Sequence, residues 1–291
     1  MTIRPRRSVL YMPGSNARAI EKARSLPADG VIIDLEDAVA PDAKVAAREQ
    51  VAAAVKQGGF GAREVFIRVN GIDTPWHAED MMAAAQAAPD AILVPKINNS
   101  DQLEMVGQRL LDMGCNKKTR IWAMIETPFA ILNILDIARA ATDSETRLAG
   151  FVLGTNDLAK EMGARPGTLR APFQGMLGMA VAAARAHGLV VLDGVFNAID
   201  DDAGFAEQCA QAVEFGFDGK TLIHPRQIAA CNAAFTPDAD AVAWARAIVA
   251  AFADPANAAK GAIRVEGRMV ERLHLAQAER DLAVAEWAAA G

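Results

Sequence analysis

The stretch GVIIDLE at residues 30–36 decides the fold, because an apolar run leads directly into carboxylates. Its residues are apolar on both faces, which is typical of a strand buried in a parallel sheet. Alanine-rich stretches with helical character separate similar runs at intervals of about 30 residues, the size of one strand–helix unit. We expect eight such strands, at residues 8–12, 30–36, 64–70, 91–96, 120–126, 148–154, 189–195 and 219–224.

Eight consecutive strand–helix units predict an α/β fold, a closed (β/α)8 TIM barrel. An open doubly wound sheet built from the same units is the structural alternative, since the sequence does not show whether the sheet closes. Helix-start signals support the division into units: Asn16, Asn99 and Thr127 each stand just before a predicted helix.

Composition narrows the class of protein. Hydrophobic residues make up 52% of the 291 residues, which is enough for a sizeable core, and the net charge is −6. Such a chain has no bulk attraction for nucleic acid or an anionic membrane surface, and its longest uncharged stretch, residues 171–184, is too short to span a bilayer. Three scattered cysteines without a C-x-x-C motif favour neither disulfides nor a zinc site. We find no signal-peptide pattern and expect a soluble, cytoplasmic protein.

The chain continues well beyond the eighth strand. We expect the barrel at residues 1–235 and a C-terminal helical extension at 236–291, with helices at 236–252 and 268–290. Residues 254–267 are rich in Ala, Gly and Asn, which predicts a flexible stalk between these helices. This arm could cover the barrel mouth, its own or that of a neighbouring subunit, or it could be a packing extension.

Polar side chains mark the carboxyl end of every predicted strand, the end where barrel enzymes place their active sites. Asp34, Arg68 and Glu126 stand against apolar runs, where a lone charge is costly to bury. We therefore favour a functional over an incidental origin for the set as a whole. Its members are Tyr11, Asp34, Glu36, Asp37, Arg68, Asn70, Lys96, Glu126, Asn156, Asp157, Asp193 and His224.

Glu126 and Asp157 follow neighbouring strands, so their carboxylates are expected to face one small space. Two carboxylates with waters and a chelating substrate are a usual arrangement for Mg²⁺. Asp157 could instead cap a short helix at residues 158–162. Lys96 could form a Schiff base, but its polar neighbours argue against the apolar pocket that such a lysine needs. P-loop and serine-hydrolase motifs do not occur.

Seven segments in order along the chain resemble the citrate lyase β-subunit and malyl-CoA lyase family of CoA-ester lyases. The resemblance implies a TIM barrel, Mg²⁺, an acyl-CoA substrate, and homotrimers or homohexamers whose C-terminal arms reach a neighbouring subunit. The segments are RSVLYMPG at 7–14, DLEDAV at 34–39, IRVNG at 67–71, IET at 125–127, GTNDL at 154–158, DGVF at 193–196 and GKTLIHP at 219–225.

The resemblance also implies roles for individual residues. Glu126 and Asp157 match the Mg²⁺ ligands, and Arg68 matches the arginine that contacts the substrate carbonyl and stabilises an enolate. Tyr11 and Lys22 fall where the family contacts CoA. Many relatives have arginine near the CoA phosphates where this chain has Asn16, and Arg18, two residues further on, is expected to compensate. We also assign Asp37 to the catalytic residues and Asp193 to the residues that bind the substrate.

The arm departs from the family at one position. Relatives carry a catalytic aspartate in a segment like Gly-x-Met-Ile-Asp, whereas residues 267–271 read GRMVE and place Glu271 there. Glutamate is one methylene longer, and a positional error of about 1 Å can cost roughly a hundredfold in rate. A carboxylate paired with Arg268 or Arg272 on a solvated helix is the alternative for Glu271.

The resulting expectation is a Mg²⁺-dependent lyase that cleaves a malyl-, citramalyl- or citryl-CoA type thioester. The alternatives are a thioesterase acting on a malyl-CoA-like ester and a CoA-ester-binding subunit with little activity of its own. A class II aldolase that uses no CoA is a more distant possibility.

Overall fold

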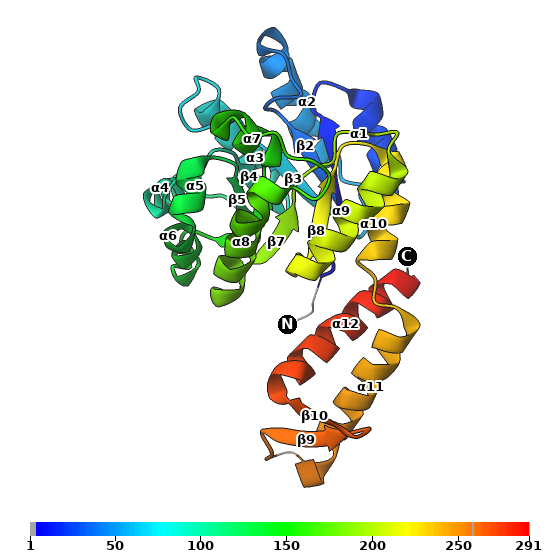
Figure 1. The fold of residues 1–291 in the computed structure, drawn as a ribbon. Helices are drawn as coiled ribbons and strands as arrows, with labels where there is room; N and C mark the ends of the chain where they lie inside the picture. The colour runs from blue at the N-terminus through cyan, green and yellow to red at the C-terminus, as the bar shows by residue number, and fades with distance from the viewer. Residues whose placement is uncertain (1–3, 258, 291) are drawn as a thin grey trace. The chain divides into compact units, whose positions relative to one another are not determined.

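A closed barrel of eight parallel strands forms the larger part of the computed structural model, which describes residues 4–257 and 259–290 (Figure 1). The strands follow one another around the barrel in sequence order, and β8 pairs with β1 to close it. The predicted (β/α)8 barrel is therefore confirmed, and the open sheet is excluded. The strands are β1 (Ser8–Pro13), β2 (Gly30–Asp34), β3 (Glu64–Arg68), β4 (Ala91–Val94), β5 (Arg120–Ile125), β6 (Leu148–Leu153), β7 (Val190–Asp193) and β8 (Gly219–Leu222).

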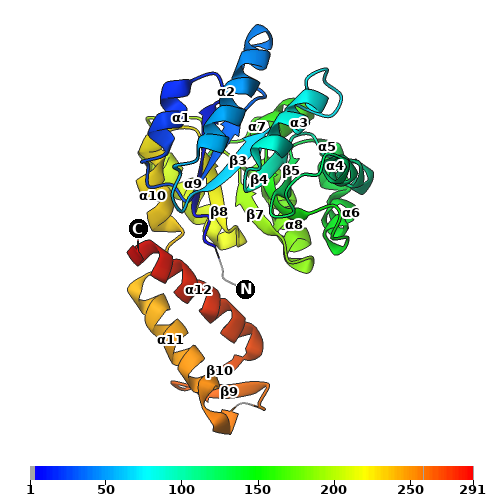
Figure 2. The same ribbon diagram turned by 180° about the vertical axis from the view of Figure 1, so that it is seen from behind.

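Helices cover the outside of the strands, as the view from behind in Figure 2 also shows. Asn16, Asn99 and Thr127 accept hydrogen bonds from main-chain N–H groups at the starts of α1, α4 and α5, as their positions predicted. The helices of this part are α1 (Ala17–Ala23), α2 (Lys44–Gln57), α3 (His77–Ala87), α4 (Ser100–Asp112), α5 (Pro128–Leu132), α6 (Ile134–Arg139), α7 (Thr155–Met162), α8 (Gln174–Ala186), α9 (Asp202–Phe215) and α10 (Ile228–Ala234).

Large apolar side chains fill the barrel interior. Phe66 and Trp122 pack edge to face with ring centroids 5.1 Å apart, and both are fully buried. The indole needs a glycine beside it, because a Cβ on Gly150 would lie 2.7 Å from the Trp122 ring. This plug closes the centre of the barrel and leaves the C-terminal rim for a site.

Seven of the eight strands end one or two residues earlier than the sequence predicts, and β1 ends one residue later. The ladder stops at Asp34, Arg68 and Leu222, so Glu36, Asn70 and His224 lie in the loops that follow. The apolar run continues past β2 and β3 because Leu35 and Val69 remain buried in the loops, whereas Ile223 and His224 after β8 are exposed.

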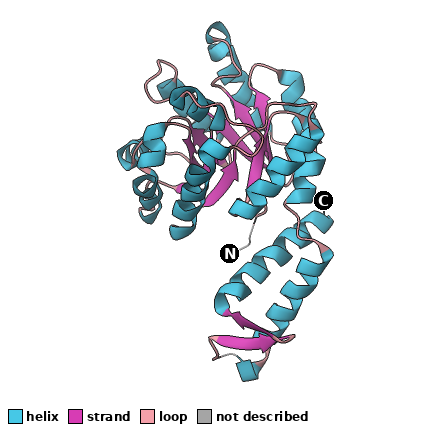
Figure 3. Ribbon diagram, in the orientation of Figure 1, coloured by secondary structure: helices cyan, strands magenta, loops and turns pink. Residues whose placement is uncertain are grey.

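A second compact unit contains the chain from Asn232 onward, four residues before the boundary expected from the sequence. It comprises α11 (Ala239–Ala253), β9 (Ala262–Val265), β10 (Arg268–Glu271) and α12 (Arg272–Ala290). The two helices lie side by side, and the two strands form an antiparallel hairpin that Figure 3 colours as strand.

The predicted flexible stalk at 254–267 is wrong in its second half. Ile263 and Val265 of β9 are buried against Ile248 and Phe252 of α11, so this segment is part of an apolar core. The composition of this segment predicted flexibility, but its last two residues, Glu266 and Gly267, form the turn of the hairpin. Glu266 and Gly267 both have positive φ, 47° and 83°, as a two-residue hairpin turn requires.

No helix in the described part of the chain is long and apolar enough to cross a membrane.

Candidate active site

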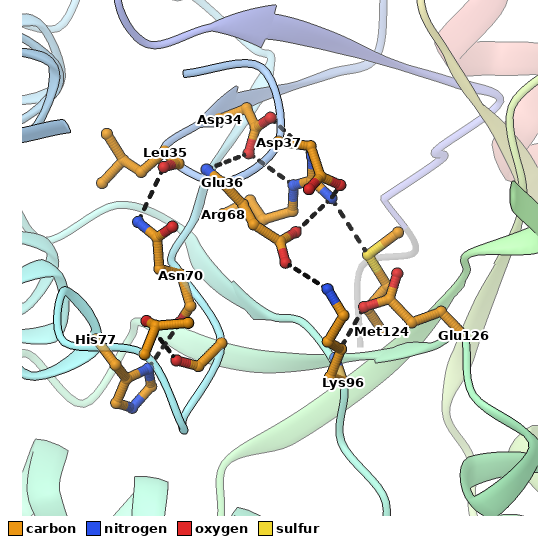
Figure 4. Close-up of polar contacts among 12 residues, drawn as sticks. Asp34, Leu35, Glu36, Asp37, Arg68, Asn70, His77, Lys96, Met124 and Glu126 are labelled. Atoms are coloured by element: carbon orange, nitrogen blue, oxygen red, sulfur yellow. Dashed lines mark hydrogen bonds and ion pairs between the residues drawn. The ribbon is translucent and has the colours of Figure 1, made fainter. Parts of the chain in front are cut away.

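Asp34 and Arg68 form the centre of the candidate site at the ends of β2 and β3, where they are register partners (Figure 4). Arg68 donates from Nε to Asp34 Oδ1 over 2.6 Å and from Nη2 to Oδ2 over 2.7 Å. Burial alone would raise the pKa of Asp34, but the charge and hydrogen bonds of Arg68 outweigh burial and lower it. Asp34 is thus ionised and fixes one edge of the guanidinium.

The other edge of Arg68 faces further polar groups. Nη1 lies 2.7 Å from Glu36 Oε2 and 3.5 Å from Asp37 Oδ2, and the guanidinium carbon lies 5.0 Å from the centre of the Tyr11 ring. Arg68 is only 6% exposed, so the side chains packed around it restrict the position of its guanidinium. Nη1 also donates to Sδ of Met124 over 3.8 Å, a long and weak contact that an oxygen atom of a bound molecule could replace.

A cavity of about 320 Å³ opens beside this edge. It brings together Tyr11, Asp37, Arg68 and Asp157, four of the residues predicted from the sequence. The hydroxyl of Tyr11 is buried and has no hydrogen-bond partner within the described residues, and burial raises its pKa further above the usual range. The phenol is therefore a neutral donor available to a bound molecule.

Glu126 directly follows β5 and is completely buried. Its Oε1 accepts a hydrogen bond of 2.8 Å from the main-chain N–H of Lys96, but its Oε2 has no partner within the described residues. Burial first, and then the charge of Glu36, raises the pKa of Glu126 to about 8, and the charge of Asp157 adds to this. A bound cation would stabilise the ionised form of this buried group, and the carboxylate of Asp157 could share the cation.

Asp157 lies in the first turn of α7, which begins at Thr155 and has Gly154 at its N-cap. The alternative in which Asp157 caps a helix is therefore wrong. The absence of a side chain at Gly154 also matters for Glu126, because a Cβ at this position would lie 2.6 Å from Glu126 Oε2. The glycine keeps open the space around the unpaired carboxylate oxygen.

These two carboxylates fit a hard divalent cation such as Mg²⁺. The residues that the structure describes contain no group of three His, Cys, Asp or Glu side chains placed to hold a metal. Protein ligands would thus be few, and Mg²⁺ commonly binds through one or two carboxylates together with waters and substrate.

Asp193 does not meet the expectation of a substrate contact. It is completely buried at the end of β7, where Lys220 Nζ lies 2.7 Å from Oδ2 and Arg170 Nη1 2.5 Å from Oδ1. Burial alone would raise the pKa of Asp193, but Lys220 and Arg170 lower it. Both oxygens accept hydrogen bonds from buried cations, so the role of Asp193 in this structure is to hold Lys220 and Arg170 inside the barrel.

Arg18 and Lys22 lie one helical turn apart on α1, and both are exposed. Neither forms an ion pair in the described part of the chain. Asn16 uses its side chain to cap the same helix. Arg18 and Lys22 are thus available to an anionic ligand.

Glu271 ends β10 in the C-terminal unit and is half-buried. Its main-chain N–H donates to Nδ1 of His274 over 2.9 Å. Its carboxylate makes no ion pair with Arg268 or Arg272 within the described residues. The sequence placed Glu271 in a helix, whereas the hairpin strand holds it just before α12 begins.

Glu36 and Lys96, which the sequence places at strand ends, form an ion pair that was not predicted. Lys96 Nζ lies 3.1 Å from Glu36 Oε1. Burial alone would lower the pKa of Lys96, but Glu36 and Glu126 raise it, which is the opposite of the shift that a Schiff-base lysine needs. The only sequence signal for this pair was the position of each residue at the end of a strand.

Fold and site together define an α/β-barrel enzyme with a buried arginine and paired carboxylates at its C-terminal rim. Residues 7–225 match the HpcH/HpaI aldolase/citrate lyase family, and the chain belongs to this family. The predicted family resemblance is confirmed.

Characterised relatives differ in the reaction that their names give. The chain is 45% identical over 286 residues to a (3S)-malyl-CoA thioesterase of Cereibacter sphaeroides, a match covering 98% of this chain and 96% of the relative. It is 33% identical over 300 residues to an L-malyl-CoA/beta-methylmalyl-CoA lyase of the same species, covering 95% and 94%. A solved structure of CitE from Mycobacterium tuberculosis in complex with magnesium, acetoacetate and coenzyme A matches with a TM-score of 0.74, 29% identity, and coverage of 97% of this chain and 98% of that chain.

Proposed function

We propose that this protein is a Mg²⁺-dependent CoA-ester lyase that cleaves a β-hydroxyacyl-CoA of the malyl-, citramalyl- or citryl-CoA type. The observation that carries the proposal is the Arg68 guanidinium, which Asp34 holds on one edge and which belongs to a residue that lines the cavity. Cleavage of the bond between Cα and Cβ leaves the enolate of an acyl-CoA, whose oxygen needs a fixed positive charge.

The cleavage requires proton transfers and stabilisation of a negative charge by the residues around the cavity. The β-hydroxyl loses its proton, the Cα–Cβ bond breaks, and the hydroxyl carbon becomes the carbonyl of a 2-oxo acid. The bonding electrons go to the enolate, which then gains a proton on carbon. Arg68 stabilises the enolate oxygen, and carboxylates carry the protons, for which we assign Asp37 beside Arg68 and Glu271 on the arm.

Glu126 and Asp157 would hold the magnesium ion. When bound, Mg²⁺ supplies Lewis-acid polarisation of the oxygen atoms of the acid half of the substrate. The unpartnered Oε2 of Glu126 supports this assignment from the structure, and the magnesium complex of the CitE relative supports it by similarity.

The CoA half of the substrate would bind along α1, where Arg18 and Lys22 are exposed. We further propose a homotrimer or homohexamer in which Glu271 serves the barrel of a neighbouring subunit. The C-terminal unit has its own core, so it can present Glu271 from a rigid hairpin.

Hydrolysis of the thioester is the second candidate, and the 45% identity to a malyl-CoA thioesterase favours it. In this reaction a carboxylate such as Glu271 would activate water, which attacks the thioester carbonyl and releases CoA. The same Arg68 would then stabilise a tetrahedral oxyanion in place of an enolate.

One assay separates the candidates. Purified protein is incubated with malyl-CoA and Mg²⁺, and glyoxylate and free thiol are followed separately. Glyoxylate with acetyl-CoA identifies the lyase, and malate with free CoA identifies the thioesterase. Citramalyl-CoA and citryl-CoA are tested in the same way, with pyruvate and oxaloacetate as the lyase products and free CoA as the sign of hydrolysis. Turnover of none of the three esters would contradict both candidates and favour a CoA-ester-binding subunit.

A further inference from the structure

Lys96 contacts two carboxylates of the candidate site, that of Glu126 and that of Glu36 (Figure 4). Its main-chain N–H donates to Glu126 Oε1 over 2.8 Å, and its Nζ lies 3.1 Å from Glu36 Oε1. The second oxygen of the same carboxylate, Glu36 Oε2, lies 2.7 Å from Arg68 Nη1. Glu36 is thus shared between two cations, with one oxygen on each.

The backbone at Lys96 is in the left-handed region, with φ at 54°. Glycine adopts this conformation at the lowest cost, and a lysine there is uncommon. The strain is explained by the two contacts of Lys96, because the turn aims its N–H at Glu126 while its side chain reaches Glu36. A glycine would keep the first contact and lose the second.

The ammonium controls how Glu36 can approach Arg68. Nε and Nη2 of Arg68 are engaged by Asp34, so Nη1 is the nitrogen in contact with Glu36. The further contact of Nη1 with Met124 Sδ is long, at 3.8 Å, so a substrate oxygen could replace it. A carboxylate with a single cation in reach prefers to place both oxygens on a guanidinium edge. Lys96 prevents this by binding one of the two oxygens.

We propose that Lys96 is a positioning residue that holds Glu36 by one oxygen and thereby keeps Nη1 of Arg68 available to an oxygen of the bound thioester. This inference rests on the proposed function, since it takes the thioester as the molecule that Arg68 meets. Lys96 itself does not touch the reacting atoms. It acts through Glu36 and Arg68.

Lys96→Met tests the ammonium, because methionine has a similar length and carries no charge. We expect kcat/KM for the acyl-CoA to fall about 10–100-fold, mainly through kcat, since the interaction with Nη1 strengthens as negative charge develops. The dissociation constant for Mg²⁺, measured by calorimetry, should stay within about twofold, because the main-chain N–H to Glu126 remains.

The double variant Lys96→Met with Glu36→Gln provides the rescue. A neutral amide does not compete for the guanidinium as a carboxylate does, so most of the lost kcat should return. Lys160→Met on α7 is the matched control and should leave kcat, KM and magnesium binding unchanged, since Lys160 is exposed and contacts neither Glu36 nor Arg68. Lys96→Ala replaces Lys96→Met if the latter does not fold.

Three results would overturn the proposal: full kcat in Lys96→Met, a loss that Glu36→Gln does not rescue, or a parallel loss of magnesium affinity. A crystal structure of Lys96→Met separates this inference from the proposed function. If the wild type turns over none of the three CoA esters, the proposed function fails and the crystal structure decides alone. Both Glu36 oxygens on Arg68 then support the positioning role, and an unmoved Glu36 refutes it.

Discussion

Asp34 and Arg68 end neighbouring strands at matched register positions, and two hydrogen bonds of 2.6 and 2.7 Å join their side chains. The pair is buried, which makes the guanidinium a fixed charge that needs no reorganisation when a substrate oxygen becomes negative. The role proposed for Arg68 thus depends on a carboxylate that uses both of its oxygens to hold the guanidinium.

Arg68→Lys should lower kcat by about 100-fold or more. A lysine ammonium is a point charge, so it cannot hold both oxygens of Asp34 and still face the cavity. Steady-state kinetics with the active acyl-CoA measures the effect, and circular dichroism checks the fold. A kcat equal to that of the wild type would remove Arg68 from its proposed role.

Glu126→Gln and Asp157→Asn should each weaken Mg²⁺ binding by at least about 10–100-fold, the range typical of losing even an outer-sphere partner. Each substitution keeps the shape of the side chain and removes its charge. Calorimetric titration with MgCl₂ measures the dissociation constant. Glu161→Gln is the control, because Glu161 is an exposed carboxylate on α7, the helix that also carries Asp157. Unchanged affinity in either ligand variant would contradict the assignment of that residue.

The barrel could be predicted because its information is local. Each strand carries its own apolar run, as residues 31–33 do, and each helix its own start signal. The hairpin of the C-terminal unit could not, because β9 and β10 have four residues each and gain their stability from packing against α11.

The site was predictable in its residue types but not in its pairings. Asp34 and Asp193 both end strands, and nothing in the sequence separates the carboxylate that holds Arg68 from the one that is enclosed. The difference comes from Lys220 and Arg170, which are distant in sequence and converge on Asp193 only in the folded barrel. Long-range contacts of this kind decide which charged groups remain accessible.

Lys220→Met should destabilise the protein by about 3–5 kcal/mol, the usual cost of removing one partner from a buried ion pair. Lys220 is completely buried and donates to Asp193 Oδ2, the carbonyl of Gly194 and Gln208 Oε1. Urea unfolding measures the free energy of unfolding. Lys117→Met, at an exposed lysine, should change it by less than about 0.5 kcal/mol. A similarly small change in Lys220→Met would show that the buried network contributes little.

The stability of the barrel should fall as pH drops below about 6.5, the usual histidine value, because of His77. Burial lowers the pKa of this imidazole, while its contact of 2.8 Å with the carbonyl of Asn70 raises it, Arg109 lowers it, and Asp80 and Asp73 raise it. The folded state therefore binds its proton at lower pH than the unfolded state does. Between the two pKa values the free energy of unfolding should decrease with falling pH by at most about 1.4 kcal/mol per pH unit.

Urea unfolding between about pH 7.5 and 5, a range that brackets the usual histidine pKa, measures this slope. His77→Gln should flatten the slope, since it keeps a side chain that can donate to the Asn70 carbonyl and cannot gain a proton. His187→Gln, at a partly exposed histidine after α8, should leave the slope as it is in the wild type. Identical slopes in all three proteins would exclude His77 as the source.

Glu271→Gln should keep CoA binding and assembly but lose most turnover, because it removes only the proton-transferring oxygen. Glu279→Gln on α12, an exposed carboxylate of the same unit, should retain activity. Calorimetry with CoA and light scattering verify that binding and assembly are intact. Normal turnover in Glu271→Gln would mean that the carboxylate has no part in the reaction.

Mixed oligomers then test whether Glu271 acts on a neighbouring barrel. Glu271→Gln subunits have an intact barrel, and Arg68→Ala subunits have an intact arm, so neither alone is active. If the arm acts across the subunit boundary, equal mixing completes about a quarter of the sites, since half of the barrels and half of the neighbouring arms are intact. If the arm serves its own barrel, no subunit holds both groups and activity stays at the level of the separate variants. Mixtures that co-assemble without regaining activity would therefore refute the shared site.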